Sequence, residues 1–425
     1  MSQLPNLLES LRAKAYYLND EHKQVVDEDG TVRRISIAFP SPDEPNMTFT
    51  RPWLAHTLRD HVQHQCPSVS SFYGYGALQV QFNDDGILVQ TFADGSKRSF
   101  RTNMLLVCDG GSSSSVHQLR VAEEEGLVTS TSGFTYIAKS SASPPLHRKT
   151  IMTSPEFTER FCPDESHPGR INFFGATKDT PHNRVFNITA YRVPLGPGEL
   201  GERSMVSVVL HKNRSLWGVD NAQGLCDIAQ ENFPHTIVTD IIDEYNVKEF
   251  LRTRTSNYRP IRVLRSVTGT TTSGSGVIVM GDVAHSFSPE LGQGFSAASE
   301  DVGILRVILS DPYDGKQAIK TLMQRYEKQR MADVRALVRI HMHGATYLLD
   351  QNKTMEKLSI NNAKMRAVLS RWFPGSMFNA IRGQMFQDLS YAEILRRADL
   401  TTARIWVSLA FTGLLLSYLT PGVFR

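Results

Sequence analysis

The chain contains few cysteines, little net charge and no long run of basic residues. The formal net charge is only +3 over 425 residues, so nothing in the composition supports nucleic-acid binding. The cysteines lie far apart without paired spacing, which argues against a disulfide framework or a zinc knuckle and favours a reducing, intracellular compartment; they are Cys66, Cys108, Cys162 and Cys226. His61, His64 and Cys66 stand close together, but no second ligand pair accompanies them, and we predict no metal site.

Glycine is absent from residues 1–19, so these residues do not contain the strand and Gly-x-Gly-x-x-Gly turn that would cradle a dinucleotide. That glycine spacing occurs once, at residues 196–201. Extended runs at residues 185–193 and 205–210 flank it, which predicts a hairpin and not a strand-to-helix turn.

The most informative stretch that is present covers residues 281–294. It follows an apolar, β-branched run at residues 277–280, which predicts a buried strand that ends in a turn. Asp282 stands at that strand end, where a carboxylate accepts hydrogen bonds from sugar hydroxyls. Gly292 and Gly294 allow a ligand to approach the main chain, and the residues after them recur at helical spacing: Phe295, Ala298, Val302, Leu305 and Leu309. The free amides at the start of that helix favour a negatively charged ligand group.

Two shorter elements come earlier in the chain. Residues 104–107 predict a short buried strand, and Asp109 and Gly110 follow it in a turn. Arg51 stands at the start of a predicted helix, where a guanidinium can fork onto phosphate oxygens.

In this order and spacing the elements resemble those of the FAD-dependent, single-component aromatic monooxygenases, whose second FAD motif reads Gly-Asp-Ala-Ala-His, then a proline, then Gly-Gln-Gly. The resemblance implies FAD as cofactor, NADPH or NADH as its reductant, and transfer of one oxygen atom to a small aromatic substrate. His285 is expected to pack and hydrogen-bond beneath the loop instead of acting as a base, and no catalytic residue is assigned. The implied cofactor-binding residues are Arg51, Asp109, Gly110, Asp282, Pro289, Gly292, Gln293, Gly294, Phe295 and Ser296.

The resemblance also implies an opening βαβ unit that holds the diphosphate and adenosine of FAD, and the sequence has no such unit. Three explanations compete: an incomplete gene model, a natural truncation without tight FAD binding, or a half that another polypeptide completes. We favour the first, because the remaining motifs are intact.

The predicted fold class is α/β: an N-terminally incomplete, Rossmann-like FAD-binding domain of the aromatic hydroxylase type, with an inserted mixed or antiparallel substrate sheet and a C-terminal helical region. A hairpin is predicted at residues 23–39, and a long helix at residues 318–340. The expected parts are substrate sheet (1–48 and 126–270), FAD-binding parts (49–125 and 271–330), C-terminal helices (331–404) and a membrane-associating segment (405–424).

Residues 405–424 carry no charge, and Arg404 stands directly before them. Trp406 and Tyr418 lie near the two ends of the apolar part, as aromatic residues do at membrane interfaces, which favours a transmembrane or membrane-associated helix. Serine, threonine and proline dilute the run, so a buried C-terminal helix is the alternative.

This tail makes the chain resemble the kynurenine 3-monooxygenases within the family, which end in a membrane-anchoring segment; the resemblance implies the mitochondrial outer membrane as a location. Their arginine for the substrate carboxylate corresponds to Lys14, the predicted substrate contact, and their later Asn-Tyr pair falls near Gly344 and Ala345. Because such changes in polar anchors alter specificity strongly, the prediction stops at a small aromatic or related substrate.

Two other functions stay open. One is a truncated, non-catalytic flavoprotein remnant that acts as a membrane or interaction protein. The other is a related flavin oxidoreductase of the same fold. The sequence predicts no oligomeric state.

Overall fold

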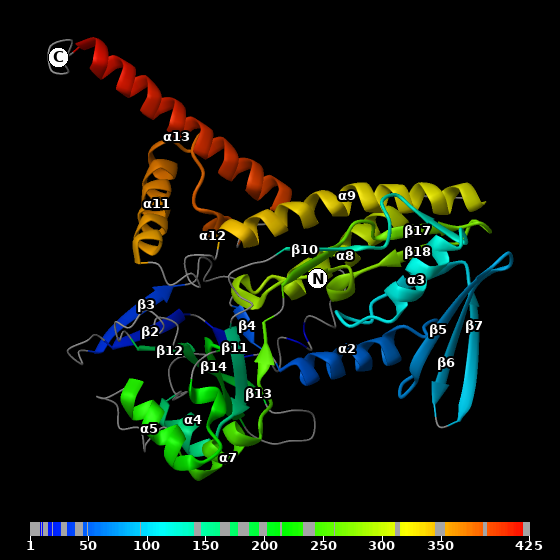
Figure 1. Cartoon of the computed structure of the whole chain (residues 1–425), viewed down its shortest axis with the longest axis horizontal. Coiled ribbons are helices and arrows are strands. Elements are labelled where there is room, and N and C mark those ends of the chain that lie inside the picture. Colours follow the sequence, from blue (N-terminus) through cyan, green and yellow to red (C-terminus); the bar gives the residue numbers. More distant parts are fainter. Residues whose placement is uncertain are drawn as a thin grey trace. The chain divides into compact units, whose positions relative to one another are not determined.

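The computed structural model describes residues 9, 11, 16–18, 20–26, 32–38, 46–48, 50–93, 95–139, 146–161, 171–176, 187–194, 202–212, 215–232, 243–258, 260–310, 315–344, 353–385 and 389–419. The chain divides into two compact units (Figure 1). Unit 1 comprises Met1–Tyr73 and Pro144–Tyr258, and unit 2 comprises Gly74–Ser143 and Arg259–Arg425.

Unit 1 is built on a seven-stranded sheet in the order β15-β11-β14-β13-β12-β2-β3, in which every pair is antiparallel except β12 with β2. A separate antiparallel pair joins β1 and β4. The strands are β1 (Tyr16–Leu18), β2 (Asp20–Val26), β3 (Val32–Ala38), β4 (Asn46–Thr48), β11 (Leu146–Met152), β12 (Ile171–Ala176), β13 (Asn187–Pro194), β14 (Glu202–His211) and β15 (Ser256–Asn257).

The helices of unit 1 are α2 (Arg51–Gln65), α4 (Pro155–Phe161), the 3₁₀ turn η1 (Ser215–Gly218), α5 (Ala222–Asn232) and α7 (Glu244–Arg252). An apolar cluster joins the last four to β11 and β14, with Phe157, Val208 and Phe250 among its buried members. Two sequence predictions are confirmed in this unit. β2 and β3 form the expected hairpin, and β13 and β14, which flank the glycine spacing, pair antiparallel; residues 196–201 themselves lie outside the described residues.

Unit 2 contains a four-stranded sheet in the order β8-β18-β17-β9, a three-stranded meander β5-β6-β7 and a three-stranded sheet β10-β16-β19. In the four-stranded sheet β8 pairs parallel to β18, and the other pairs are antiparallel. The strands are β5 (Gly76–Asn83), β6 (Gly86–Ala93), β7 (Ser96–Thr102), β8 (Met104–Val107), β9 (Val128–Ser130), β10 (Tyr136–Lys139), β16 (Ile261–Leu264), β17 (Thr268–Thr271), β18 (Gly276–Val279) and β19 (His285–Ser286).

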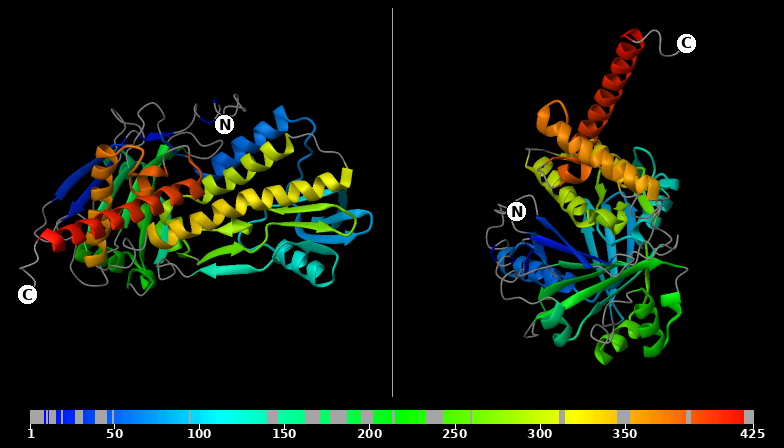
Figure 2. Two further views of the ribbon diagram at one scale, coloured as in Figure 1. Left: turned by 90° about the horizontal axis from the view of Figure 1, so that it is seen from above. Right: turned by 90° about the vertical axis from the view of Figure 1, so that its left-hand side faces the viewer.

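The helices of unit 2 include α9, which runs alongside β17 and β18 (Figure 2). Its Glu327 carboxylate accepts hydrogen bonds from the Thr268 backbone amide at 3.0 Å and the Thr268 hydroxyl at 2.6 Å, so a buried carboxylate docks the helix on β17. The helical elements are α3 (Ser115–Glu124), the 3₁₀ turns η2 (Gly281–Val283) and η3 (Pro289–Leu291), α8 (Gly294–Leu309), α9 (Gly315–Gly344), α11 (Lys353–Trp372), α12 (Ile381–Gln384) and α13 (Tyr391–Leu419). The predicted helix at residues 318–340 is confirmed as α9.

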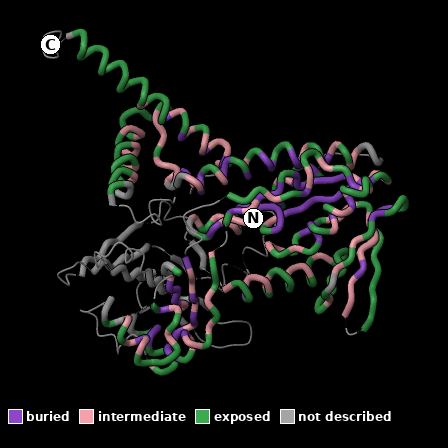
Figure 3. Tube along the Cα trace, in the orientation of Figure 1, coloured by how far each residue is buried: buried purple, intermediate pink, exposed green. Residues whose placement is uncertain are grey.

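The core of unit 2 surrounds the four-stranded sheet, with every residue of β18 buried (Figure 3). One side of helix α8 is buried and carries Ala297, Leu305 and Ile308. The strand expected at residues 277–280 therefore exists as a buried inner strand, which pairs parallel with β8 and antiparallel with β17 and against which α9 packs.

Residues 49–73 belong to unit 1, whereas the prediction assigned residues 49–125 to one FAD-binding part. Helix α2 belongs to unit 1, where Trp53 packs against Leu11, whereas the prediction placed α2 with the Asp-Gly turn. The predicted functional parts stay a prediction.

Candidate functional site

Two loops of unit 2 lie side by side because they follow the carboxyl ends of neighbouring parallel strands. β8 and β18 pair in register from Met104 with Gly276 to Val107 with Val279. A side-chain atom on Gly111 would come within 3.7 Å of the Asp282 carbonyl oxygen, so the two loops are in contact after the strands end. Crevices at the carboxyl ends of parallel strands are where open α/β sheets bind their ligands.

The first loop is the Asp-Gly turn. The Asp109 carboxylate accepts hydrogen bonds from the Ser115 hydroxyl at 2.8 Å and the Ser115 amide at 3.4 Å, and it thereby caps the start of α3. Gly110 has a φ of +82°, which disfavours any residue with a side chain, and the space beside it is open. Asp109 therefore shapes the turn, although its side chain is also exposed.

The second loop contains Asp282, which is exposed at the end of β18, and continues to the start of α8. Gly292 adopts a φ of +67°, and a side-chain atom built on Gly292 or Gly294 would meet nothing within 4 Å. Gln293 precedes the helix without a side-chain capping bond, so the first amides of α8 have no side-chain partner from it. Phe295 and Ser296 follow on the exposed side of that first turn.

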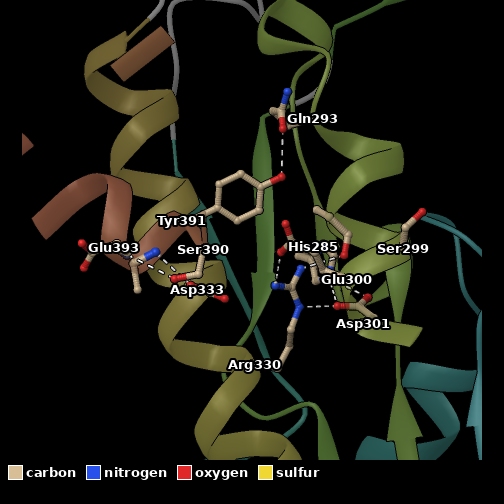
Figure 4. A network of polar contacts seen from close by, with 12 residues as sticks. His285, Gln293, Ser299, Glu300, Asp301, Arg330, Asp333, Ser390, Tyr391 and Glu393 are labelled. Atoms are coloured by element: carbon tan, nitrogen blue, oxygen red, sulfur yellow. Dashed lines mark hydrogen bonds and ion pairs between the residues drawn. The ribbon is translucent and has the colours of Figure 1, made fainter. Parts of the chain in front are cut away.

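The Gln293 side chain is bonded within the protein, and its contact with the cofactor stays a prediction. Its amide oxygen accepts a hydrogen bond from the Tyr391 hydroxyl at 2.9 Å, and its amide nitrogen donates to the Leu291 carbonyl at 3.1 Å (Figure 4). The first residue of α13 thus supports the loop before α8. Sequence reasoning missed Tyr391, because nothing local links it to residue 293.

A buried ionic network lies beneath the second loop (Figure 4). The Asp301 carboxylate, 1% exposed, accepts hydrogen bonds from His285 Nε2 at 2.8 Å and from the Gly281 amide at 2.6 Å. Arg330 of α9 also donates to Asp301, and it donates to Glu300 at 3.0 Å and to the Ala297 carbonyl at 2.8 Å. The network fixes both ends of the turn after β18 to α8 and α9. His285 is buried and bonded, which confirms its expected packing role.

The charges of this network follow from its contacts. Burial opposes ionisation of Asp301, but the hydrogen bond and charge of His285, the charge of Arg330 and the Gly281 amide outweigh it, so the Asp301 pKa lies below its ordinary value. Burial raises the pKa of Glu300 to about 7, and the neighbouring carboxylates add to this against the opposing charge of Arg330. Asp301 is therefore the firmly ionised partner, and Glu300 is the titrating one.

A third element, β10, braces the same turn from another direction. The Tyr136 hydroxyl donates to the Val283 carbonyl at 2.7 Å, and the Arg262 guanidinium lies 4.2 Å from the centre of the Tyr136 ring. The backbone after β18 is thus held by β10 as well as by α8 and α9, and a turn braced on several sides is suited to holding a ligand in one place.

The remaining predicted residues are placed as follows. Pro289 begins η3 and is exposed. Arg51 is the first residue of α2, whose start is capped by Thr50, and its side chain is exposed; it belongs to unit 1, and its contact with a diphosphate stays a prediction. Lys14 and Ala345 lie outside the described residues.

These residues fit the flavin-facing part of a flavin dinucleotide. The polar groups are suitable: a carboxylate at a strand end for a sugar-like hydroxyl, and first helix amides that the Gln293 side chain does not cap, beside glycines that leave space for a ring. Among the described residues no strand-to-helix turn has the Gly-x-Gly-x-x-Gly spacing for the phosphates, so the fit concerns one end of the cofactor.

The fold and the site define an FAD-binding α/β protein. Residues 57–341 match the family described as FAD binding domain, and the chain belongs to that family. The crystal structure of tetracycline destructase Tet(51) is similar, with 13% identity and a TM-score of 0.50 over 86% of this chain and 82% of that chain. That of tetracycline destructase Tet(55) has 14% identity and a TM-score of 0.49 over 85% and 81%. Likeness at these identities concerns the fold alone. No curated protein matches the chain.

Proposed function

We propose that this protein is an FAD-dependent monooxygenase that uses NADPH or NADH to hydroxylate a small aromatic substrate. The observation that carries the proposal is the junction of the Asp-Gly turn, the Asp282 turn and the uncapped start of α8 at the carboxyl ends of β8 and β18. When bound, FAD supplies the redox chemistry that activates oxygen.

The chain's own residues bind and orient. Asp282 accepts a hydrogen bond from a hydroxyl of the cofactor chain, and the amides of the first turn of α8 stabilise negative charge on the ring. Asp301, Arg330 and His285 hold the turn after β18 so that these groups keep one geometry. Tyr391 does the same for the loop before α8.

The substrate proposal rests on the sequence resemblance to kynurenine 3-monooxygenases. The Lys14 ammonium would pair with a carboxylate of an aromatic acid, although it lacks the bidentate fork of arginine. Gly344, the last residue of α9, offers no polar side chain where those enzymes have one. We therefore propose an aromatic acid with fewer polar substituents than kynurenine.

The adenosine and phosphate end of FAD needs a further strand, and we propose that it pairs with β8. β8 is the outer strand of its described sheet, and Leu106 is 46% exposed on it, although parallel sheets are normally covered on both faces. A strand beside β8 would bring a glycine-rich turn to the same carboxyl edge. Sequencing the transcript upstream of the codon for Met1 tests this. An in-frame strand followed by Gly-x-Gly-x-x-Gly is the expected finding, and a stop codon there would contradict it.

Attachment to a membrane through α13 is part of the proposal. α13 is long and apolar enough to span a bilayer by length and composition, and its apolar part is almost entirely exposed. The mitochondrial outer membrane is the proposed location, by resemblance to the kynurenine 3-monooxygenases.

Binding of FAD is the decisive test. Protein purified with FAD should show a flavin absorption spectrum, and FAD at about 100 times its Kd should stabilise the fold by about 2.7 kcal/mol. Asp282→Ala should abolish flavin retention. Asp84→Ala, in the exposed turn between β5 and β6 of the same unit, is the matched control and should retain it.

A second measurement separates the candidate functions. Consumption of NADPH or NADH that aromatic acids accelerate supports the monooxygenase. A protein that neither binds FAD nor is stabilised by it would be a non-catalytic flavoprotein relative. Flavin binding with reductase activity but no oxygen transfer would indicate another flavin oxidoreductase of this fold.

A further inference from the structure

Helix α11 exposes most of its large apolar residues, and its half-buried side consists mainly of small residues together with Leu369. Leu358, Met365 and Trp372 follow one another at two-turn intervals and are 57%, 41% and 75% exposed. Val368, 51% exposed, lies on the same side, and Phe373 continues it just beyond the helix. The half-buried side instead carries Ser359, Ala363, Ala367 and Ser370. This arrangement is the reverse of a soluble amphipathic helix.

A row of basic residues borders this apolar stripe, here defined as Leu358, Met365, Val368, Trp372 and Phe373. Lys357, Lys364 and Arg371 each precede a stripe residue by one position, and all three are exposed. Helical geometry therefore places them along one edge of the stripe. A helix with an exposed apolar face beside a row of lysine and arginine side chains has the composition of one that lies in a membrane interface.

The position of α11 in unit 2 links it to α13. Arg366, on the inner side of α11, donates to the Ala398 carbonyl at 3.3 Å and to the Thr402 hydroxyl at 2.7 Å. The turn after α11 is tied to the same segment, since the Phe378 amide donates to the Thr401 hydroxyl at 3.0 Å. The exposed apolar part of α13 starts within a turn of these contacts, at Trp406, which is 68% exposed.

The two helices cross instead of running along each other (Figures 1 and 2). If α13 spans the bilayer, a helix that crosses it at its base is placed at the membrane surface. We propose that the apolar stripe of α11 inserts into the interface of a membrane containing anionic lipids, with Lys357, Lys364 and Arg371 at the headgroups. The inference rests on the proposed membrane attachment through α13.

Charge and continuity favour lipid as the occupant of the stripe. The exposed basic row favours a negatively charged surface, and anionic lipids provide one. A second copy of the chain would instead bring the same basic row close to this one, and the two rows would repel each other. The stripe also lies next to the exposed apolar part of α13, so one membrane can cover both.

Quenching of tryptophan fluorescence by brominated lipids tests the two helices separately in the full chain. Trp372 reports on α11, and Trp406 reports on α13. Subtracting the fluorescence of Trp372→Phe from that of the full chain gives the Trp372 signal, and Trp406→Phe gives the Trp406 signal in the same way. Vesicles of brominated phosphatidylcholine, with or without phosphatidylserine, serve as the membrane. Both residues should be quenched, and Trp372 more strongly when phosphatidylserine is present. The variant that lacks both retains Trp53, which is 5% exposed, and Trp217, which is half-buried, and neither should be quenched.

A charge-reversal variant tests the basic row. Lys357→Glu, Lys364→Glu and Arg371→Glu together should reduce Trp372 quenching in phosphatidylserine vesicles to the level in phosphatidylcholine alone, and leave Trp406 quenching unchanged. The matched control reverses three exposed lysines elsewhere, Lys139, Lys212 and Lys328, and should change neither signal.

Each result has a definite meaning. Quenching of Trp406 without Trp372 overturns the α11 proposal and leaves the α13 anchor intact. Absence of both overturns membrane attachment itself. A blue-shifted but unquenched Trp372 shows that protein, either a second copy or another partner, covers the stripe, and it overturns the lipid assignment.

Discussion

Unit 2 places charged residues beside apolar surface in two opposite ways. Beneath the turn after β18, Asp301 and Arg330 are each 1% exposed, and their charges are paired inside the core. At α11 and the end of α13 the large apolar residues are exposed, and the charges stand beside them in solvent. Both arrangements are costly in water unless something compensates.

The two regions differ in what offsets the cost of the buried charges and of the exposed apolar surface. In the buried network the compensation is internal, because each carboxylate and guanidinium finds a partner and the turn becomes fixed. At the C-terminal helices it must come from outside, since the described residues leave the apolar surface uncovered. The first region therefore builds a site, and the second builds a surface for a partner.

The largest effect is expected from removing the centre of the buried network. Asp301→Ala removes the fully buried partner of Arg330 and leaves it only Glu300, which is 35% exposed; the loss of one partner of a buried pair costs about 3–5 kcal/mol. Denaturant unfolding measures the change in free energy. Asp399→Ala is the matched control, because Asp399 pairs with Arg339 at 3.3 Å while both are exposed, and it should change stability by less than about 1 kcal/mol.

Asp301→Asn keeps the shape of the side chain and should lose less stability than Asp301→Ala. Equal and small effects of the Asp301 and Asp399 variants would show that the inner network carries no more stability than a surface ion pair, and the comparison between the two regions would fail.

A charge in the apolar end of α13 should have the next largest effect. Leu414 is 70% exposed, and Leu414→Arg places a charge near the middle of the segment at a cost of about 2.5–3.5 kcal/mol if that segment spans a bilayer. The variant should shift from the membrane fraction to the soluble fraction on centrifugation. Arg335→Leu, at an exposed residue of α9, serves as a composition control and should leave the distribution unchanged. An unchanged distribution for Leu414→Arg would exclude α13 as the anchor.

The sequence predicts the local parts of the site and misses the distant ones. Asp109 and Asp282 could be found, since an apolar run followed by a turn is a local pattern. Asp301 and Arg330 depend on which side of α8 and α9 faces inward, and α8 is apolar on both sides: Leu305 is buried, whereas Val302 is 58% exposed. Periodicity cannot choose between two apolar sides. The sequence feature that could have indicated the network is Asp301, an acidic residue within the apolar helix α8.

A smaller effect is expected at the contact between α13 and the loop before α8. Tyr391→Phe removes the hydroxyl that donates to Gln293, and the loss of one such bond costs about 1 kcal/mol. Weaker FAD retention with a nearly unchanged fold is the expected result, measured by fluorescence titration of FAD and by melting temperature. Tyr418→Phe, in the same helix but 82% exposed, should change neither. Identical FAD affinity in both variants would remove Tyr391 from the site.

A pH-dependent effect is expected from the titration of Glu300 at the edge of the buried network. Its pKa is raised from 4.5 to about 7, mainly by burial, so ionising it is less favourable in the folded protein than in the unfolded chain. The folded state therefore binds more protons between these two values, and this residue's contribution to stability falls as the pH rises from about 4.5 to about 7. Asp301, whose pKa is lowered, stays ionised over that range and contributes the opposite dependence only in more acidic solution.

Glu300→Gln removes the titrating group and keeps the side chain beside Arg330. The melting temperature of the unaltered protein, relative to that of Glu300→Gln, should fall as the pH is raised from 5 to 8. Glu124→Gln, an exposed residue of α3, is the control and should give a difference that does not vary with pH. If the Glu300 difference is constant or rises over this range, Glu300 is ionised throughout, and the edge of the network carries a fixed ion pair like its centre.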